Sequence, residues 1–270
     1  RTPIIFMKKI LVTGPSGYVG KAFIEAYGKK YSLRLFGRNP IDGYDFVVGD
    51  VKNLDKCVAA ACGVDIILHM AAATTSKKGV SDRDYIETNI VGTINILEAA
   101  ARNKVNKVVY CSSVCAVGFR ATPKLIMETD TPDPSDGIYG YSKYIGEKLC
   151  EGYSEKYGIN IICLRLGMVF PLHEFQVPSN MHNRYWLGSV HVDDVLEAIR
   201  LSIDDEKIRF DVFHVASGSP HSKFDISKAR NILGYNPKNK LEEYIHLKAS
   251  KAGFFTRILA RLRFLLQLKD

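Results

Sequence analysis

The strongest constraint on the fold of this chain is a repeated alternation between short apolar segments and segments with helical periodicity. The apolar segments lack the apolar–polar alternation of a strand with one face in water, so we expect strands that are buried on both faces. Such strands predict an α/β protein with a doubly wound parallel sheet of the Rossmann type. The expected strands lie at 9–13, 32–37, 45–50, 64–72, 107–113, 159–167 and 211–218.

Helical spacing predicts helices between these strands, at 19–30, 54–62, 85–103, 139–158 and 191–203. After Pro171 the chain becomes polar and irregular. We therefore expect two parts. Residues 7–170 form a dinucleotide-binding Rossmann domain, and residues 171–270 form a small substrate-binding lobe, with 189–215 returning to the Rossmann sheet.

The composition is that of an ordinary soluble protein, with 46% hydrophobic and 24% charged residues. No stretch approaches the ~20 apolar residues of a membrane span, and the first residues lack the apolar core and cleavage site of a signal peptide. The six cysteines have no metal-site spacing, and we expect buried free thiols in a reducing compartment. These features predict a cytoplasmic protein without a metal site.

The net charge of +8 is concentrated at the end of the chain, where residues 247–270 hold six Lys or Arg and one Asp. The body has no basic run, which argues against a nucleic-acid partner. In the tail, apolar residues recur at helical spacing (Phe254, Ile258, Leu262 and Leu266) and predict an amphipathic helix. This helix is expected to pack on its own fold or on a second subunit of a homodimer; the alternative is a membrane surface.

A glycine-rich turn directly follows the first expected strand and opens a helix. Gly14, Gly17 and Gly20 are spaced T-G-x-x-G-x-x-G, which permits a tight turn and close approach of the backbone to a pyrophosphate. The helix N-terminus adds unpaired N–H groups and a positive dipole end. The β-α-β context is the one in which such a turn binds a dinucleotide.

The second and third strands bear on the choice between NAD and NADP. Gly37 and Arg38 stand where an NAD-binding protein is expected to place a carboxylate. Arg38 could pair with a 2′-phosphate, so NADP is preferred over NAD, although Arg38 could instead stack on the adenine. Asp50 could accept a hydrogen bond from the adenine amino group or cap the following helix.

A proton-transfer pair is expected in the stretch from Ile138 to Lys148. Tyr139 and Lys143 are four residues apart and share one helix face, while Ser113 ends a strand at the carboxyl edge of the sheet. A free phenol has a pKa near ~10. A lysine at ~5 Å and an oxidised nicotinamide ring would lower this pKa toward neutral pH. The neighbouring Tyr141 and Tyr144 are expected to be packing residues, and Lys148 is expected to be solvated.

The ordered motifs "TGPSGYVG", "GDV", "HMAAAT", "TNIVGT", "SSVCAVG", "YGYSK", "LRLGMVF", "VHVDDV" and "LGYNPK" resemble the extended short-chain dehydrogenase/reductase family, also called NAD-dependent epimerase/dehydratases. The resemblance implies that Tyr139 is the general acid/base, Lys143 its activator and ribose ligand, and Ser113 the donor to a substrate oxygen. It also implies a set of cofactor-binding positions. These are Gly14, Ser16, Gly17, Tyr18, Val19, Gly20, Arg38, Asp50, Val51, Met70, Ala71, Ala72, Asn89, Tyr139, Lys143 and Leu166.

The segment between "LRLGMVF" and "VHVDDV" is short compared with family members that hold nucleotide-sugars. In this the chain resembles the uronate dehydrogenases, a compact branch of the family that oxidises a free sugar acid. The resemblance implies substrate contacts from Ser76, Ser113, Asn180 and Arg184, with Arg184 pairing with a carboxylate. We expect an NAD(P)-dependent oxidoreductase or epimerase acting on a sugar or sugar acid.

The alternatives are a nucleotide-sugar epimerase/dehydratase, an NADPH-dependent carbonyl reductase, and a catalytically silent dinucleotide-binding regulator. Two histidines suggest other chemistry at first sight. His191 precedes Asp193 and Asp194, which fits a helix start better than a metal or acid/base cluster. His69 ends a buried strand and is expected to be a satisfied core residue.

Overall fold

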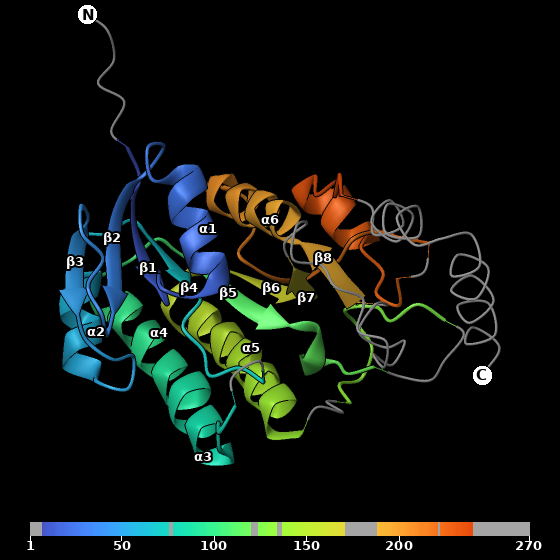
Figure 1. The fold of residues 1–270 in the computed structure, drawn as a ribbon, viewed down its shortest axis with the longest axis horizontal. Coiled ribbons are helices and arrows are strands. Elements are labelled where there is room, and N and C mark those ends of the chain that lie inside the picture. The colour runs from blue at the N-terminus through green and yellow to red at the C-terminus, as the bar shows by residue number, and fades with distance from the viewer. Residues whose placement is uncertain are drawn as a thin grey trace, which may run out of the picture.

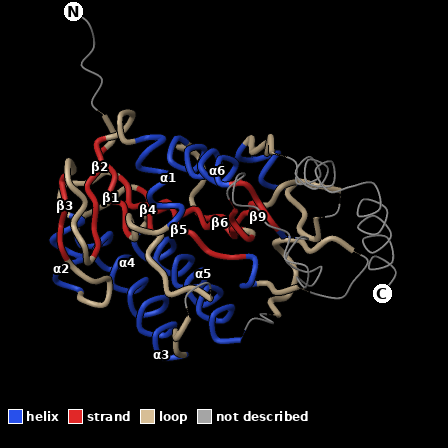
Figure 2. The backbone as a smooth tube through the Cα atoms, in the orientation of Figure 1, coloured by secondary structure: helices blue, strands red, loops and turns tan. Residues whose placement is uncertain are grey.

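The structure, a computed structural model, describes residues 7–75, 78–119, 124–133, 137–170, 188–220 and 222–239. At its centre is a parallel sheet with helices on both faces (Figures 1 and 2). The strands of this sheet follow the order β3-β2-β1-β4-β5-β6-β9, and every neighbouring pair is parallel. They are β1 (Lys9–Thr13), β2 (Ser32–Gly37), β3 (Asp45–Val48), β4 (Ile66–His69), β5 (Lys107–Ser113), β6 (Asn160–Leu166) and β9 (Phe210–Val215).

The central strands are buried on both faces because alternate side chains enter two separate cores. In β1, Ile10 and Val12 belong to one apolar cluster, and Leu11 belongs to the other. All three side chains have no exposed area. Each such side chain contributes roughly 1.5–3 kcal/mol to folding by leaving water. This explains why the strands read as continuous apolar runs in the sequence.

The helices divide between these two faces (Figure 1). The first core lies under α1 (Tyr18–Tyr27) and α6 (Val192–Asp204), which pack against each other. The second lies under α2 (Leu54–Ala61), α4 (Gly92–Arg102) and α5 (Gly137–Tyr157). The doubly wound Rossmann fold expected from the sequence is therefore confirmed.

The expected helix at 85–103 is divided into three pieces. A short α3 (Asp82–Tyr85) leads into a π-helical stretch, η1 (Ile86–Val91), and α4 follows without a break. Ser81 and Asp84 form a capping box that fixes the start of α3. Wider π turns are frequent at functional sites, and this one holds the buried Asn89.

A small second layer lies beside the carboxyl ends of β6 and β9. The strands β7 (Met168–Phe170) and β8 (Ser189–His191) form a two-stranded parallel sheet that the sequence did not predict. A single bridge joins Ile126 to Phe224. Two further short helical elements are η2 (Val114–Ala116) and the π-helical η4 (Ala229–Leu233).

The structure also tests several smaller expectations. The expectation that Tyr141 is a packing residue is wrong, because 51% of Tyr141 is exposed on the outer face of α5. Four of the cysteines are buried free thiols, whereas Cys62 is exposed. His191 caps α6 by accepting a hydrogen bond from the Asp193 amide, as expected for a helix start.

None of the described helices is long and apolar enough to cross a membrane. The division into parts at residue 170 and the cytoplasmic location stay predictions.

Candidate active site

The candidate site begins at the glycine-rich turn between β1 and α1. Gly14 has a positive φ of 69°, and a methyl group added there would come within 2.8 Å of the Ala71 nitrogen. A methyl group at Gly20 would overlap the Gly14 carbonyl oxygen. The first turn of α1 contains no acidic residue that would compete with an anion for its N–H groups. Only glycine therefore permits the tight packing of this turn against the loop after β4 and against its own backbone, and such a turn at a helix N-terminus fits a dinucleotide pyrophosphate.

The positions after the turn face outward, where a cofactor could reach them. Ser16, Gly17 and Tyr18 are exposed, and Val19 is half-buried against the first core. The turn lies where the strand order reverses, between β1 and β4. Ligands of open α/β sheets bind at this switch point.

Thr13 and His69 join the glycine-rich turn to the end of β4. The Thr13 hydroxyl accepts hydrogen bonds from the amides of Met70 (3.1 Å) and Ala71 (3.0 Å). It also lies 2.8 Å from His69 Nδ1, while His69 Nε2 lies 3.1 Å from the Thr93 hydroxyl. Burial and the nearby Lys143 charge lower the His69 pKa to about 3, so the ring is neutral. His69 is therefore a satisfied core residue, as expected.

The ends of β2 and β3 form the expected adenosine side of the site. Gly37 lies beside Pro15 of the glycine-rich turn, and Arg38 follows it with an exposed side chain. Asp50 is half-buried and accepts a hydrogen bond from the Lys52 amide at 3.0 Å. The alternative role of Asp50 as a helix cap is wrong, because Asn53 caps α2. The adjacent Val51 is buried.

Asn89 connects the loop after β4 to α5 near the N-terminus of that helix. Its amide oxygen accepts from the Ala73 N–H at 2.8 Å, and its amide nitrogen donates to the Ala73 carbonyl at 3.0 Å. The same nitrogen donates to the Ser142 hydroxyl at 2.9 Å, which in turn donates to the Tyr139 carbonyl at 2.7 Å. The side chain of Asn89 thus holds the half-buried Met70, Ala71 and Ala72 near the expected catalytic helix.

Ser113, Tyr139 and Lys143 come from elements that pack together. Ser113 is the last residue of β5 and caps η2, where its Oγ accepts from the Cys115 amide at 3.2 Å. A hydroxyl that accepts one bond can still donate its proton. Tyr139 and Lys143 lie one turn apart in α5, and both are buried. α5 packs against η2, and Lys143 bonds to the Cys111 carbonyl two residues before Ser113, so the elements that carry the three residues lie together. Leu166 ends β6 directly opposite Ser113.

Lys143 is held by backbone and aromatic groups of β5. Its Nζ donates to the Cys111 carbonyl at 2.9 Å and lies 5.1 Å from the centre of the Tyr110 ring. Burial lowers the pKa of the ammonium to about 8, partly opposed by Cys111, Glu147, Cys115 and Cys150. The cation is therefore present at neutral pH and is poised to lose its proton at mildly alkaline pH.

Some of the expected site residues lie outside the described residues, namely Ser76, Asn180 and Arg184. The apolar stripe from Phe254 to Leu266 lies outside them too. Conversely, Thr13, Tyr85 and Ser142 contact the site but were not predicted. Thr13 and Ser142 stand inside the "TGPSGYVG" and "YGYSK" motifs, so a signal for them exists in the sequence. Tyr85 is distant from Tyr139 in the sequence, and their rings come into contact only in the folded chain.

The sheet and the site geometry define a dinucleotide-binding protein of the Rossmann type. Residues 10–186 match the NAD dependent epimerase/dehydratase family. The chain therefore belongs to this family, and the expected membership is confirmed.

The relatives include several sugar dehydrogenases. A uronate dehydrogenase of Pseudomonas syringae pv. tomato is 32% identical over 247 residues, covering 87% of this chain and 84% of the relative. The L-arabinose 1-dehydrogenase (NAD(P)(+)) of Haloferax volcanii is 26% identical, covering 86% of this chain and 97% of the relative. The crystal structure of uronate dehydrogenase from Agrobacterium tumefaciens superposes with a TM-score of 0.78 at 26% identity, covering 92% and 90% of the two chains. The resemblance to uronate dehydrogenases is confirmed.

Proposed function

We propose that this protein is an NAD(P)-dependent dehydrogenase that oxidises a hydroxyl group of a free sugar or sugar acid. The observation that carries the proposal is the position of Ser113, Tyr139 and Lys143 at the carboxyl edge of the sheet, beside a pyrophosphate cradle. The similarity to uronate and L-arabinose dehydrogenases supports a sugar as the substrate class. The oxidised nicotinamide, when bound, supplies the hydride acceptor.

The residues of the chain would move the proton and orient the substrate. The Tyr139 phenolate accepts the hydroxyl proton as the C–H hydride leaves, so a carbonyl forms and the charge balances. The Lys143 ammonium stabilises the phenolate, because a cation at ~5 Å with an effective dielectric constant of ~20 lowers a phenol pKa by roughly two units. The Ser113 hydroxyl donates to the substrate oxygen and holds it beside Tyr139.

NADP is the preferred cofactor in this proposal. Arg38 is exposed just beyond β2, and among the described residues no hydrogen bond or ion pair engages its guanidinium. Position 37 is a glycine and carries no carboxylate that would repel a 2′-phosphate. NAD remains the alternative, since a mutant of the Agrobacterium uronate dehydrogenase was solved in complex with NAD.

The small C-terminal part would provide the substrate contacts. Asp194 ties residues after η4 to the start of α6, because its carboxylate accepts from the amides of Lys238 (2.8 Å) and Asn239 (3.1 Å). In the proposal Ser76, Asn180 and Arg184 face the sugar, and Arg184 pairs with a substrate carboxylate. A homodimer is part of the same proposal.

The test combines cofactor binding with turnover. Calorimetry with NADP+ and NAD+ is expected to show binding of at least one of them. A screen of free sugars and uronates, followed by nicotinamide absorbance, is expected to show turnover that Tyr139→Phe abolishes without loss of cofactor binding. The absence of binding to either cofactor would overturn the proposal. Turnover by Tyr139→Phe at the wild-type rate would remove the assigned base.

A further inference from the structure

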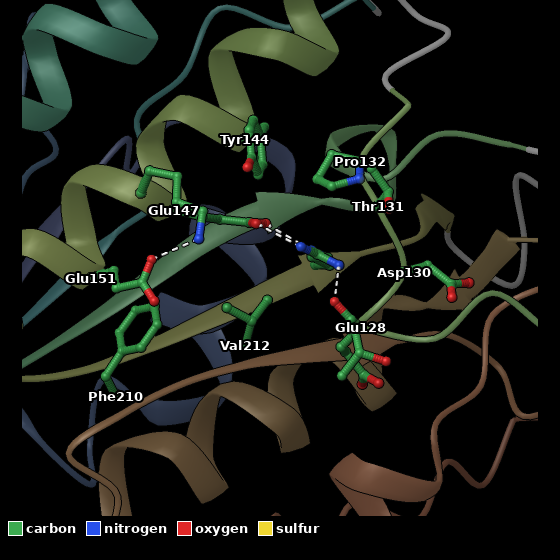
Figure 3. A pocket seen from close by; sticks show the side chains of 12 residues that line it. Glu128, Asp130, Thr131, Pro132, Tyr144, Glu147, Glu151, Phe210 and Val212 are labelled. Atoms are coloured by element: carbon green, nitrogen blue, oxygen red, sulfur yellow. Dashed lines mark hydrogen bonds and ion pairs between the residues drawn. The ribbon is translucent and has the colours of Figure 1, made fainter.

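A buried carboxylate stands one helical turn beyond Lys143. Glu147 is 3% exposed. It accepts three hydrogen bonds, from Ser112 Oγ at 2.5 Å, Arg165 Nε at 2.9 Å and Arg165 Nη2 at 2.8 Å. Figure 3 shows the Glu147 side chain pointing away from α5. The pairing with Arg165 is bidentate, which fixes the carboxylate in direction as well as in distance.

Each group in this cluster neighbours a residue of the candidate active site. Ser112 directly precedes Ser113 on β5, and Arg165 directly precedes Leu166 on β6. Glu147 follows Lys143 by four residues and shares its face of α5. One carboxylate therefore ties together the three elements that carry the hydroxyl donor, the proton-transfer pair and the end of β6.

The cluster continues toward the C-terminal part of the chain. Arg165 Nη1 donates to the Glu128 carbonyl at 3.3 Å and lies 3.5 Å from His214 Nε2. Burial lowers the His214 pKa to about 3, so the neutral ring accepts at Nε2 and donates from Nδ1 to the Asp225 carbonyl at 3.1 Å. The Glu128 carboxylate in turn accepts from the His214 amide at 2.9 Å. The catalytic helix is thus linked to residues 124–133 and 222–226.

The surroundings of the pair argue against a role in stability alone. A cavity of about 480 Å³ adjoins the pair, and Glu128, Tyr144, Glu151 and Val212 help to line it (Figure 3). A buried ion pair loses the hydration of both charges, and well-packed apolar residues are often as stable in its place. The observation that remains to be explained is the placement of this pair between three functional elements.

We propose that Glu147 and Arg165 are positioning residues that hold Ser113 and the Tyr139–Lys143 pair in their reactive arrangement. The proposal rests on the function proposed above. In this arrangement the charge of Lys143 stays at a fixed distance from the Tyr139 phenol. The Lys143 Nζ is held by the Cys111 carbonyl of β5, whereas Tyr139 moves with α5. A looser cluster lets α5 shift relative to β5, so the average distance between the ammonium and the phenol grows and the phenolate loses support.

The first test removes one link without leaving a charge unpaired. Ser112→Ala deletes the hydrogen bond from β5 to Glu147 and leaves the ion pair in place. The matched control is Ser154→Ala, which removes a buried hydroxyl from α5, the helix that carries Glu147. The Ser154 hydroxyl donates to the Arg209 carbonyl, away from the site. Both variants are compared with wild type.

The readout is the apparent pKa of the Tyr139 phenol, measured by ultraviolet titration of each cofactor-free protein. The same titration of that protein carrying the additional substitution Tyr139→Phe is subtracted, so that only Tyr139 contributes. An increase of ~1 Å in the distance from Lys143 raises this pKa by ~0.4 at an effective dielectric constant of ~20. We expect a rise of this order in Ser112→Ala and none in Ser154→Ala. Equal pKa values in all three proteins would overturn the proposal. The titration needs no sugar, so its outcome is separate from the question of the substrate.

The second test replaces the whole pair by apolar residues. The double variant Glu147→Leu with Arg165→Met keeps the volume and leaves no single buried charge, so it is expected to fold and to melt near the wild-type temperature. With NADP+ or NAD+ and a sugar that wild type oxidises, kcat is expected to fall at least tenfold, while KM for the cofactor stays within twofold. A stable double variant with wild-type kcat would overturn the proposal.

Discussion

The ring of Tyr85 lies against the ring of Tyr139, with centroids 5.6 Å apart and planes tilted by 56°. Tyr85 ends α3, and Tyr139 lies in the first turn of α5, so the contact joins two helices that are far apart in the sequence. The capping box of Ser81 and Asp84 fixes the short α3 on which Tyr85 stands. We infer that Tyr85 limits the orientations that the Tyr139 phenol can take.

Tyr85→Ala is expected to lower kcat by roughly three- to tenfold, because a tilted aromatic pair contributes about 0.5–1.5 kcal/mol. Steady-state kinetics with the sugar found for wild type would measure the loss. Tyr85→Phe keeps the ring and is expected to retain activity. The control is Tyr157→Ala, which breaks the similar 5.3 Å ring contact with Tyr153 at the other end of α5. The interpretation is wrong if both alanine variants lose activity equally.

The buried Lys143 predicts a dependence of stability on pH with a defined sign. Its pKa in the folded protein is about 8, lowered from 10.5 mainly by burial. Between these two values the unfolded chain holds a proton that the folded chain has lost, so this group makes the free energy of unfolding rise with pH. The contribution is at most about 3 kcal/mol across this range.

Urea titrations of wild type and Lys143→Met between neutral pH and pH ~10.5 would measure this effect. The difference between the two proteins separates Lys143 from distant buried groups such as Cys57, whose pKa is raised to about 12 by burial and which acts in both proteins. The stability of wild type relative to Lys143→Met is expected to increase above pH ~8. A constant difference would show that Lys143 titrates in the folded protein as it does in water.

The choice of cofactor is tested at Arg38. A charge-assisted hydrogen bond contributes about 1.5–3 kcal/mol, so Arg38→Ala is expected to weaken NADP+ binding by roughly ten- to a hundredfold. NAD+ binding is expected to stay nearly unchanged, and calorimetry with both cofactors measures the two affinities. Arg102→Ala, at an exposed arginine of α4 that pairs with Glu98, is the control. Equal losses for both cofactors would assign Arg38 to the adenine instead.

Gly37→Asp is the complementary change. A Cβ atom at this position would lie 3.4 Å from Pro15 Cδ and 3.7 Å from Phe46 Cζ, which are ordinary contacts, so the structure has room for a side chain. A carboxylate there would accept from a ribose 2′-hydroxyl and repel a 2′-phosphate. The affinity ratio of NADP+ to NAD+ is therefore expected to fall at least tenfold. An unchanged ratio would place the 2′ position of the ribose away from Gly37.

Sequence patterns predicted the central sheet well, because its strands are mainly apolar runs bounded by turn residues. Ile10, Leu11 and Val12 of β1 show the physical reason: both faces of the strand are buried, so no polar residue interrupts the run. The glycine-rich turn was equally clear, since only glycine fits its close contacts. Patterns along the chain that follow from burial and from backbone geometry can be read directly.

Features that depend on contacts across the fold were harder to predict. The buried pair of Glu147 and Arg165 joins residues 18 positions apart, and nothing local distinguishes either from a solvated charge. The π turn around Asn89 leaves the apolar pattern of residues 85–103 intact, so that pattern fits one long helix. Tyr141 was expected to be a packing residue, yet it lies on an exposed face of α5.

Gly146 allows α5 to approach β5 closely. A Cβ atom added at Gly146 would overlap the Oη atom of Tyr110, a fully buried side chain of β5. Among the buried side-chain polar atoms of the described residues, the Tyr110 Oη has no hydrogen-bond partner. A buried hydroxyl without a partner costs about 1–3 kcal/mol. Tyr110→Phe is therefore expected to leave stability unchanged or to raise it.

Gly146→Ala is expected to destabilise the protein by up to about 2 kcal/mol, because overpacking costs about 1–3 kcal/mol and the gain in helix propensity offsets at most about 1 kcal/mol of this. The matched control is Gly152→Ala on the same helix, where a Cβ atom meets nothing within 4 Å, and a gain of about 0.5–1 kcal/mol is expected. Tyr110→Phe should recover part of the loss in Gly146→Ala, since it removes the atom that the new methyl group meets. Urea unfolding of wild type, Gly146→Ala, Tyr110→Phe and the double variant gives the coupling energy between the two positions. A coupling near zero would show that the helix shifts away from β5 and that Tyr110 Oη does not set the spacing.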